Sequence, residues 1–255
     1  MVEQQTFSAG NFDAVLFDMD GVVTDTAEAH AAAWKRLFDE YLEQHARRAG
    51  EAFRPFDAEG DYHRYVDGKP RRDGVDSFLA SRGIKLPRGN LDDDFEQNTV
   101  SGLANRKDSY FTAWLAKNKV RAFPGTLAFI SALKRRGIKI ALFSSSHHAT
   151  AVLRSAGVLR LFDAKVDGDD LERQHLPGKP DPAMLLEAAT RLGVVPARSI
   201  IVEDAIAGVE AGKRGGFGLV IGVDRGHNAA ALQRAGASIV VRDLAELGWV
   251  AGEPP

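Results

Sequence analysis

Short apolar runs alternate with helical segments through the second half of the chain, and this alternation limits the fold more than any other feature. The runs that indicate strands lie at residues 138–143, 199–202, 219–221 and 238–241. The segments with helical periodicity lie at residues 126–136, 181–193 and 205–214. Such alternation favours a parallel sheet covered by helices on both faces, and we therefore predict a doubly wound, Rossmann-like α/β core.

A first strand is predicted at residues 14–17, far from the other strands in the sequence. Asp25 and Glu28 have the spacing of a capping box, and apolar residues then recur at helical intervals. The sequence that follows is polar and helical, with no strong strand signal before about residue 120. We therefore expect a core formed by residues 1–25 and 121–255, with a helical cap domain inserted at residues 26–120.

Composition excludes several classes of protein. The 255 residues include 33 Lys and Arg against 35 Asp and Glu, so the formal charge of −2 offers no broad basic surface for nucleic acid. The chain has no cysteine, which excludes disulfides, a thiolate nucleophile and cysteine-ligated metals. No apolar stretch approaches the ~18 residues that span a bilayer, and the N-terminus lacks the pattern of a signal peptide. We expect a cytoplasmic protein that binds neither nucleic acid nor membranes.

Polar residues directly follow several of the expected strands. They form four clusters, namely Asp18 to Gly21, Ser144 to Ser146, Lys179 within GKPDP, and Glu203 with Asp204. In open α/β sheets, ligands bind at the carboxyl ends of the strands. These clusters therefore form the candidate functional site.

Convergence of the clusters would bring four carboxylates into one crevice, those of Asp18, Asp20, Glu203 and Asp204. Repulsion between them opposes this arrangement unless a cation neutralises them or some of their pKa values rise. Ligation by oxygen alone suits Mg²⁺, which keeps several waters and commonly bridges to a phosphate. A carboxylate beside such an ion is able to attack phosphorus and form an aspartyl phosphate. The acidic clusters therefore predict a magnesium site that serves phosphoryl transfer.

Phosphoryl transfer also needs donors that bind the charged phosphoryl oxygens. Ser144, backbone N–H groups at the start of a helix and the ammonium of Lys179 would supply them. Each motif has an ordinary structural alternative, since an Asp-x-Asp-Gly string is usually a turn and Asp181 after Lys179 suits a helix cap. The four clusters in this order favour the catalytic interpretation.

The ordered set of DxDG, serine, lysine and Glu-Asp resembles the haloacid-dehalogenase-like phosphotransferases, and the insertion after the first strand resembles their subgroup with a helical cap. The likeness extends over nearly the whole chain. It implies that Asp18 is the nucleophile and Asp20 the general acid and base. The phosphate-binding residues that it implies are Ser144, Ser145 and Lys179. The Mg²⁺ ligands that it implies are Asp18, the backbone carbonyl of Asp20 and Asp204, with Glu203 supporting the site directly or through water.

Residues 18–30 together with Trp34 are similar to the β-phosphoglucomutase family. Members of that family interconvert β-glucose 1-phosphate and glucose 6-phosphate through β-glucose 1,6-bisphosphate. Their Gly-x-x-Arg cap motif matches residues 68–71, and their cap lysine matches Lys107. The substrate-binding residues that this resemblance implies are Thr26, His30, Trp34, Gly68, Arg71, Lys107 and Ser146.

A bisphosphate carries a second dianion away from the metal, and this dianion needs cationic partners of its own. Arg71 and Lys107 would provide them, which favours a mutase over a hydrolase of monophosphates. The ordinary alternatives are a solvated charge cluster around Arg71 and simple packing of His30 and Trp34 on one helix face. The rival functions are a sugar-phosphate phosphatase that uses the same residues and a non-enzymatic phosphate-binding module.

Two features depart from the mutase pattern. His147 and His148 follow the serines at positions where mutases carry a lysine and an asparagine. Residues 43–64 form a longer stretch than a compact cap needs, so they would reshape the sugar pocket or form a partner surface. Both departures concern the specificity for the sugar rather than the phosphoryl chemistry.

Overall fold

The computed structural model describes residues 6–8 and 11–250. The chain divides into two compact units, which we call the sheet unit and the helical unit. The sheet unit contains Met1–Asp25 and Val120–Pro255, and the helical unit contains Thr26–Lys119. In the described part of the chain, no helix has both the length and the apolar character required to span a bilayer.

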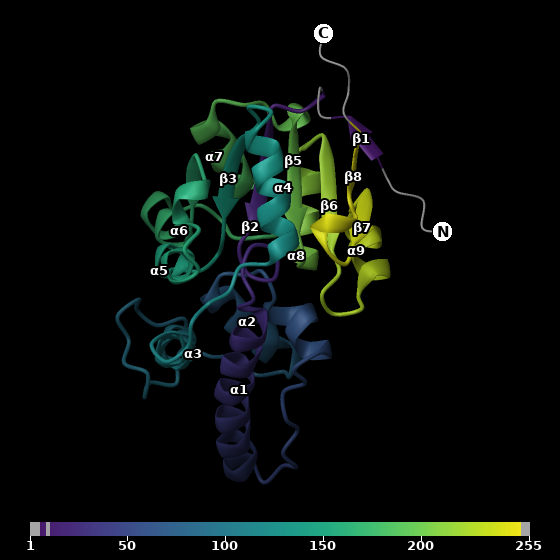
Figure 1. Ribbon diagram of the computed structural model, residues 1–255. Helices are drawn as coiled ribbons and strands as arrows, with labels where there is room; N and C mark the ends of the chain where they lie inside the picture. The colour runs from purple at the N-terminus through teal and green to yellow at the C-terminus, as the bar shows by residue number, and fades with distance from the viewer. Residues whose placement is uncertain (1–5, 9–10, 251–255) are drawn as a thin grey trace. The chain divides into compact units, whose positions relative to one another are not determined.

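A six-stranded parallel sheet forms the centre of the sheet unit (Figure 1). In spatial order its strands are β4 (Ala164–Val166), β3 (Lys139–Phe143), β2 (Ala14–Asp18), β5 (Ser199–Glu203), β6 (Leu219–Val223) and β7 (Ile239–Val241). Two short strands, β1 (Thr6–Ser8) and β8 (Gly248–Val250), pair in parallel as a separate sheet. The chain runs outward from β2 through β3 to β4 and then from β5 to β7, so the order reverses between β2 and β5. Ligands bind at such a reversal in doubly wound folds.

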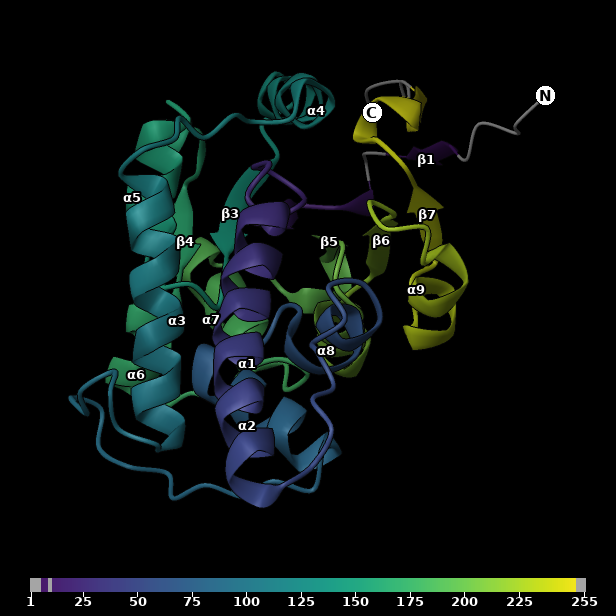
Figure 2. The same ribbon diagram turned by 90° about the horizontal axis from the view of Figure 1, so that it is seen from below.

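Helices cover both faces of the large sheet (Figures 1 and 2). Helix α4 (Pro124–Lys134) lies on one face, and α7 (Ala183–Leu192) and α8 (Ile206–Arg214) lie on the other. Alternate residues of β2 contact opposite layers, since Phe17 meets Phe129 of α4 edge to face at 6.1 Å, whereas Leu16 shares an apolar cluster with Met184 of α7. Burial on both faces explains why β2 is apolar without alternation. The predicted doubly wound α/β fold is confirmed.

The remaining elements of the sheet unit are short. They are the helices α5 (Ala149–Ser155), α6 (Gly168–Gln174) and α9 (Ala229–Ala235), with 3₁₀ turns at Leu159–Leu161, Pro196–Arg198 and Leu244–Glu246. Helix α6 begins with a capping box between Asp167 and Asp170. Helix α7 ends as predicted at Gly193, whose left-handed conformation suits glycine.

The helical unit contains α1 (Ala27–Ala49), a π-helical turn at Tyr62–Val66, α2 (Arg71–Ser81) and α3 (Val100–Leu115). Its core is aromatic, since Phe38 packs on Phe78 at 4.1 Å and on Phe56 at 5.2 Å between ring centroids. All residues of this unit are described and none lies in a strand, which confirms the absence of a strand between residues 26 and 119. The long loops before the π-helical turn and before α3 are less helical than the sequence pattern indicates.

The predicted capping box of Asp25 and Glu28 is wrong. Helix α1 has Thr26 as its N-cap residue, with no capping hydrogen bond from a side chain. Asp25 instead accepts a hydrogen bond through Oδ1 from the backbone N–H of Arg121 at 2.9 Å. The carboxylate of Asp25 thus connects the segment in which the chain leaves the sheet unit to the segment, at Arg121, in which it returns.

Candidate active site

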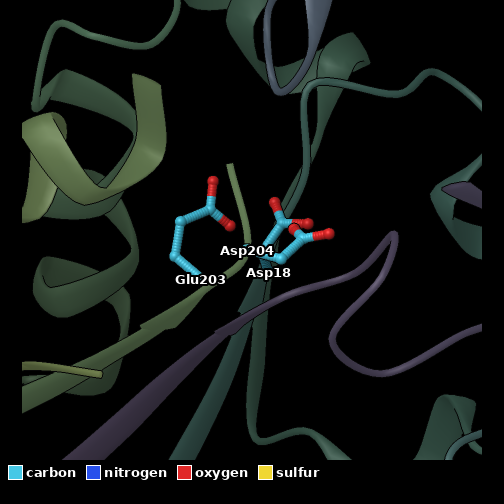
Figure 3. Close-up of side chains that lie close together, drawn as sticks. All are labelled: Asp18, Glu203 and Asp204. Carbon is cyan, nitrogen blue, oxygen red and sulfur yellow. The ribbon is translucent and has the colours of Figure 1, made fainter. Parts of the chain in front are cut away.

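Three carboxylates converge at the carboxyl edge of the sheet, where β2 and β5 lie side by side. Asp18 is the last residue of β2, Glu203 is the last residue of β5, and Asp204 follows it. One oxygen from each residue lies within 4.8 Å of the others, and Figure 3 shows the side chains of Asp18 and Asp204 next to each other with Glu203 beside them. These oxygens are hard donors of the kind that hold Mg²⁺. The cluster is therefore able to bind a divalent metal ion.

The ammonium group of Lys179 is buried against this acidic cluster. Lys179 lies in the loop between α6 and α7, is joined to Pro180 by a cis peptide bond and is only 2% exposed. Its Nζ donates to Asp18 Oδ1 at 2.7 Å and to Glu203 Oε1 at 3.0 Å. Burial alone would lower the pKa of Lys179, but the charges of Asp18 and Glu203 and their hydrogen bonds outweigh it and hold the pKa above its usual value. Lys179 is therefore a fixed positive charge beside Asp18.

Two glycines let the backbone approach the carboxylates closely. Gly21 has a φ of +81°, and a Cβ at this position would lie 1.8 Å from Asp204 Oδ2. A Cβ at Gly208, in the first turn of α8, would lie 1.7 Å from Glu203 Oε1. Only glycine fits both positions without displacing a carboxylate oxygen. The sequence pattern marks Gly21 as a loop residue and gives no signal for Gly208.

The backbone closes residues 18–24 into a compact turn, which we call the 18–24 turn. The N–H of Gly21 donates to the carbonyl of Thr24 at 2.8 Å, and the N–H of Val23 donates to the carbonyl of Met19 at 2.9 Å. The Oγ1 of Thr24 also donates to the Met19 carbonyl, at 3.2 Å. Asp20 lies inside this closed turn. Among the described residues its carboxylate is not one of the three that converge.

The predicted phosphate-binding serines begin directly after β3. Asp18 pairs with Phe143 across the sheet, so Ser144 is the first residue beyond the strand next to Asp18. Ser144 is 1% exposed, and its Oγ accepts a hydrogen bond from the N–H of Ser146 at 3.1 Å. The Oγ of Ser146 in turn accepts one from the N–H of His148 at 3.1 Å. The loop is thereby folded into a tight turn that leads into α5.

Several predicted substrate-binding residues of the helical unit pack together. The Nζ of Lys107 on α3 lies 2.7 Å from Nδ1 of His30 on α1, and the His30 ring stacks on Phe111 with centroids 3.8 Å apart. Lys107 is 5% exposed, and its Nζ lies 5.1 Å from the centroid of the Trp34 ring. An ammonium is a donor only, so donation from Lys107 needs an acceptor lone pair on Nδ1 of His30. Trp34 itself belongs to the aromatic core of the unit and stacks on Phe38.

The other predicted residues of the helical unit lie at helix starts or in the turn before one. Thr26 is the buried N-cap residue of α1. Arg71 is the first residue of α2, and its Nη1 lies 3.6 Å from Asp108 Oδ1, in a pair that is about a quarter exposed on each side. Gly68, in the turn before α2, has a φ of +70°. Arg71 is therefore a weakly paired cation at the surface of the helical unit.

Comparison with known proteins agrees with this geometry. Residues 12–216 match the family of haloacid dehalogenase-like hydrolases. A protein of Mycobacterium bovis named beta-phosphoglucomutase is 46% identical over 237 residues, which cover 92% of this chain and 90% of that protein. A phosphorylated carbohydrates phosphatase of Thermotoga maritima is 31% identical over 90% of this chain and 94% of its own length.

A solved structure of β-phosphoglucomutase from Clostridium difficile has a similar fold. It superimposes with a TM-score of 0.72 at 27% sequence identity, and the match covers 93% of both chains. The family match spans well over half of the present chain, and the strand ends that carry the acidic cluster lie within it. The chain therefore belongs to the haloacid dehalogenase-like hydrolase family.

Proposed function

We propose that this protein is a Mg²⁺-dependent β-phosphoglucomutase that interconverts β-glucose 1-phosphate and glucose 6-phosphate through a bisphosphate. The observation that carries the proposal is the buried Asp18 carboxylate at the end of β2, with Lys179 at 2.7 Å and two further carboxylates beside it. The high identity to the mycobacterial mutase over nearly the whole chain supports the same reaction.

Asp18 is the nucleophile in this proposal. A carboxylate oxygen of Asp18 attacks phosphorus, an O–P bond forms, and the bond between phosphorus and the sugar oxygen breaks. Asp20, two residues along in the 18–24 turn, gives its proton to the departing sugar oxygen. In the reverse transfer Asp20 takes the proton of the attacking sugar hydroxyl. The hydrogen bond from Lys179 fixes the orientation of the Asp18 carboxylate for both steps.

The donor set of the site fits a magnesium ion. We assign its ligands to Asp18, Asp204 and the backbone carbonyl of Asp20, with Glu203 supporting the site directly or through water. Bound there, Mg²⁺ would neutralise charge on the phosphoryl oxygens and on the carboxylates. Lys179 already compensates part of the charge of Asp18 and Glu203, which explains how these acids are tolerated in a buried position.

The transferring phosphoryl group is bound by Ser144, Ser145 and Lys179 in this proposal. Ser144 lies next to Asp18 through the register of β2 and β3, and its loop leads into the N-terminus of α5, where backbone N–H groups favour an anion. We assign contacts with the sugar to Ser146 from the same loop.

We further infer that the helical unit acts as the cap and binds the part of the substrate that does not react. We assign the second phosphate to Arg71, because its ion pair with Asp108 is weak and partly exposed, so a phosphate dianion would be able to replace Asp108 as its partner. Lys107 provides a second cation, held in place by His30. The remaining substrate contacts that we assign to this unit come from Thr26, His30, Trp34 and Gly68.

A product assay tests the proposal. The enzyme is mixed with Mg²⁺, β-glucose 1-phosphate and a trace of β-glucose 1,6-bisphosphate, and glucose 6-phosphate and inorganic phosphate are both measured. Glucose 6-phosphate as the main product supports the mutase. The second candidate is a sugar-phosphate phosphatase, which the similarity to the Thermotoga phosphatase favours, and stoichiometric inorganic phosphate would establish it instead. An inert protein across several sugar phosphates would contradict both.

A further inference from the structure

Arg225 makes contacts with three separate segments of the sheet unit. It lies in the loop that follows β6, and its Nε donates to the backbone carbonyl of Gly21 at 2.9 Å. Its Nη1 donates to the carbonyl of Arg242 at 2.9 Å and lies 3.6 Å from Asp243 Oδ2. The guanidinium carbon lies 3.7 Å from the centroid of the Phe123 ring. One side chain thus joins the 18–24 turn, the segment before α4 and the C-terminal part of the sheet unit.

The contact with Gly21 bears on the carboxylate cluster. Gly21 has the left-handed conformation and lies so close to Asp204 that a Cβ would overlap Oδ2. Its N–H is already bonded to Thr24 within the turn, and Arg225 binds its carbonyl from outside. The peptide groups on both sides of Gly21 are therefore held, and Asp20 directly precedes them.

The contact with Phe123 holds the other chain segment at this place. The N–H of Phe123 donates to the carbonyl of Val23 at 3.0 Å, and Ala122 forms an isolated bridge with Thr24. The 18–24 turn and the segment that returns to the sheet unit are thus paired through their backbones. The guanidinium carbon of Arg225 lies over the Phe123 ring of the returning segment, and its Nε donates to the Gly21 carbonyl of the turn, so Arg225 contacts both segments.

We propose that Arg225 is a positioning residue that presets the 18–24 turn for metal binding and phosphoryl transfer. Its contacts are with Gly21, Phe123, Arg242 and Asp243 rather than with Asp18, Glu203 or Asp204, so it acts through the carbonyl of Gly21. The role requires a planar guanidinium, because two of its nitrogens donate to two different carbonyls while the group lies over an aromatic ring. A lysine ammonium is a single point of charge and does not make these three contacts together. The inference rests on the proposed function where it concerns the metal, but the effect on the turn does not depend on it.

Arg198 offers a matched control. It forms a two-point pair with Asp13, with both N–O distances at 2.7 Å, just before the opposite end of β2. Arg198→Gln therefore removes an arginine pair at the amino ends of β2 and β5, remote from the carboxyl edge. Arg225→Gln and Arg225→Lys are the test variants, and Phe123→Leu is a milder variant that removes only the stacked ring.

Two measurements without substrate test the proposal. Hydrogen exchange of the peptide that contains residues 18–24 should become several-fold faster in Arg225→Gln and Arg225→Lys, and remain unchanged in Arg198→Gln. The dissociation constant of Mn²⁺, followed by electron paramagnetic resonance as a probe of the metal site, should rise about tenfold in both Arg225 variants. Phe123→Leu should shift both quantities in the same direction by a smaller amount, and it tests the proposal if Arg225→Gln does not fold.

Other outcomes would overturn the proposal. Unchanged exchange in the 18–24 turn of Arg225→Gln would show that the arginine does not hold the turn. Full recovery in Arg225→Lys would show that charge rather than the guanidinium fork is responsible. Faster exchange with unchanged Mn²⁺ affinity would show that Arg225 holds the turn but does not affect metal binding, which would refute the proposed effect on the metal site. Failure of the unaltered protein to bind Mn²⁺ would count against the proposed function, whereas the exchange measurement would still decide the role of Arg225.

Discussion

Replacement of Lys179 by methionine should destabilise the metal-free protein strongly. Methionine keeps most of the apolar stem but removes the ammonium, so Asp18 and Glu203 lose the donor that lies 2.7 Å and 3.0 Å from them. Hydrogen bonds between charged groups contribute about 1.5–3 kcal/mol each, which gives about 3–6 kcal/mol for the two. Removal of one partner from a buried ion pair has a comparable effect of about 3–5 kcal/mol. We expect Lys179→Met to lose about 3–5 kcal/mol of unfolding free energy.

Urea unfolding in the presence of a chelator measures this effect. Lys139→Met is the matched control, because Lys139 is exposed and donates only to the carbonyl of Leu192, and it should change the unfolding free energy by less than about 1 kcal/mol. Adding Glu203→Gln to Lys179→Met should restore part of the loss, since one uncompensated buried charge is removed. A loss below about 1 kcal/mol in Lys179→Met would refute the reasoning that the carboxylates depend on this ammonium.

The contacts of Lys179 with Asp18 and Glu203 also predict how the stability of the protein depends on pH. The pKa of Lys179 is higher in the folded protein than the value of about 10.4 expected when unfolded. Its contribution to stability is therefore fully present below the unfolded pKa and is lost only as the pH rises through the higher folded value. The difference in unfolding free energy between the unaltered protein and Lys179→Met should stay constant from about pH 7 to pH 9.

Gly21→Ala should reduce Mn²⁺ affinity and thermal stability more than Gly193→Ala. Both glycines have a positive φ, but only a Cβ at Gly21 would overlap Asp204. Equal effects of the two substitutions on Mn²⁺ binding and on thermal unfolding would contradict the steric argument. The pKa of Tyr110 is raised to about 12, because burial and the hydrogen bond and charge of Glu40 disfavour the phenolate. The stabilising contribution of neutral Tyr110 should thus be lost as the pH rises from about 10 to about 12, and Tyr110→Phe should remove the component that titrates near pH 12 in the tyrosinate absorbance. Chelation of divalent ions should abolish turnover, and added Mg²⁺ should restore it; activity that persists in excess chelator would contradict a metal-dependent reaction.

The central part of the fold was predictable because its strands are buried on both faces. Strands β2, β3 and β5 form continuous apolar runs for this reason, and their helices carry clear stop signals such as Gly193. Strand β4 and helix α9, with three and seven residues, are too short to show periodicity. Strand β4 is placed by its pairing with β3, and α9 is placed by its packing against α8, β6 and β7. The local pattern encodes neither contact.

The acidic cluster was predictable for a related reason. Asp18, Glu203 and Asp204 follow or end strands, and parallel strands place their carboxyl ends at one edge. The structure places Thr26 at the N-cap of α1 in place of Asp25, which was predicted from its capping-box spacing to Glu28. The carboxylate of Asp25 instead binds the N–H of Arg121, a tertiary contact that overrides the local preference.

The sequence pattern did not predict the supporting roles of Gly208 and Arg225. Gly208 is set by the space beside Glu203, and Arg225 binds a backbone carbonyl 204 residues away. The position of Arg225 after β6 was a usable signal, because it lies at the carboxyl end of a strand. The residues around Arg225 in the sequence do not identify Gly21 as its partner, because every residue has a backbone carbonyl and the acceptor therefore has no sequence signature.

Identification of the phosphorylated residue tests the central claim most directly. The protein is mixed with Mg²⁺ and β-glucose 1,6-bisphosphate, quenched in acid within a turnover, digested and mapped by mass spectrometry. The mechanism predicts a phosphoryl group on Asp18 in the unaltered protein and none in Asp18→Asn. Phosphorylation of a different residue, or transfer by Asp18→Asn at the rate of the unaltered protein, would contradict it.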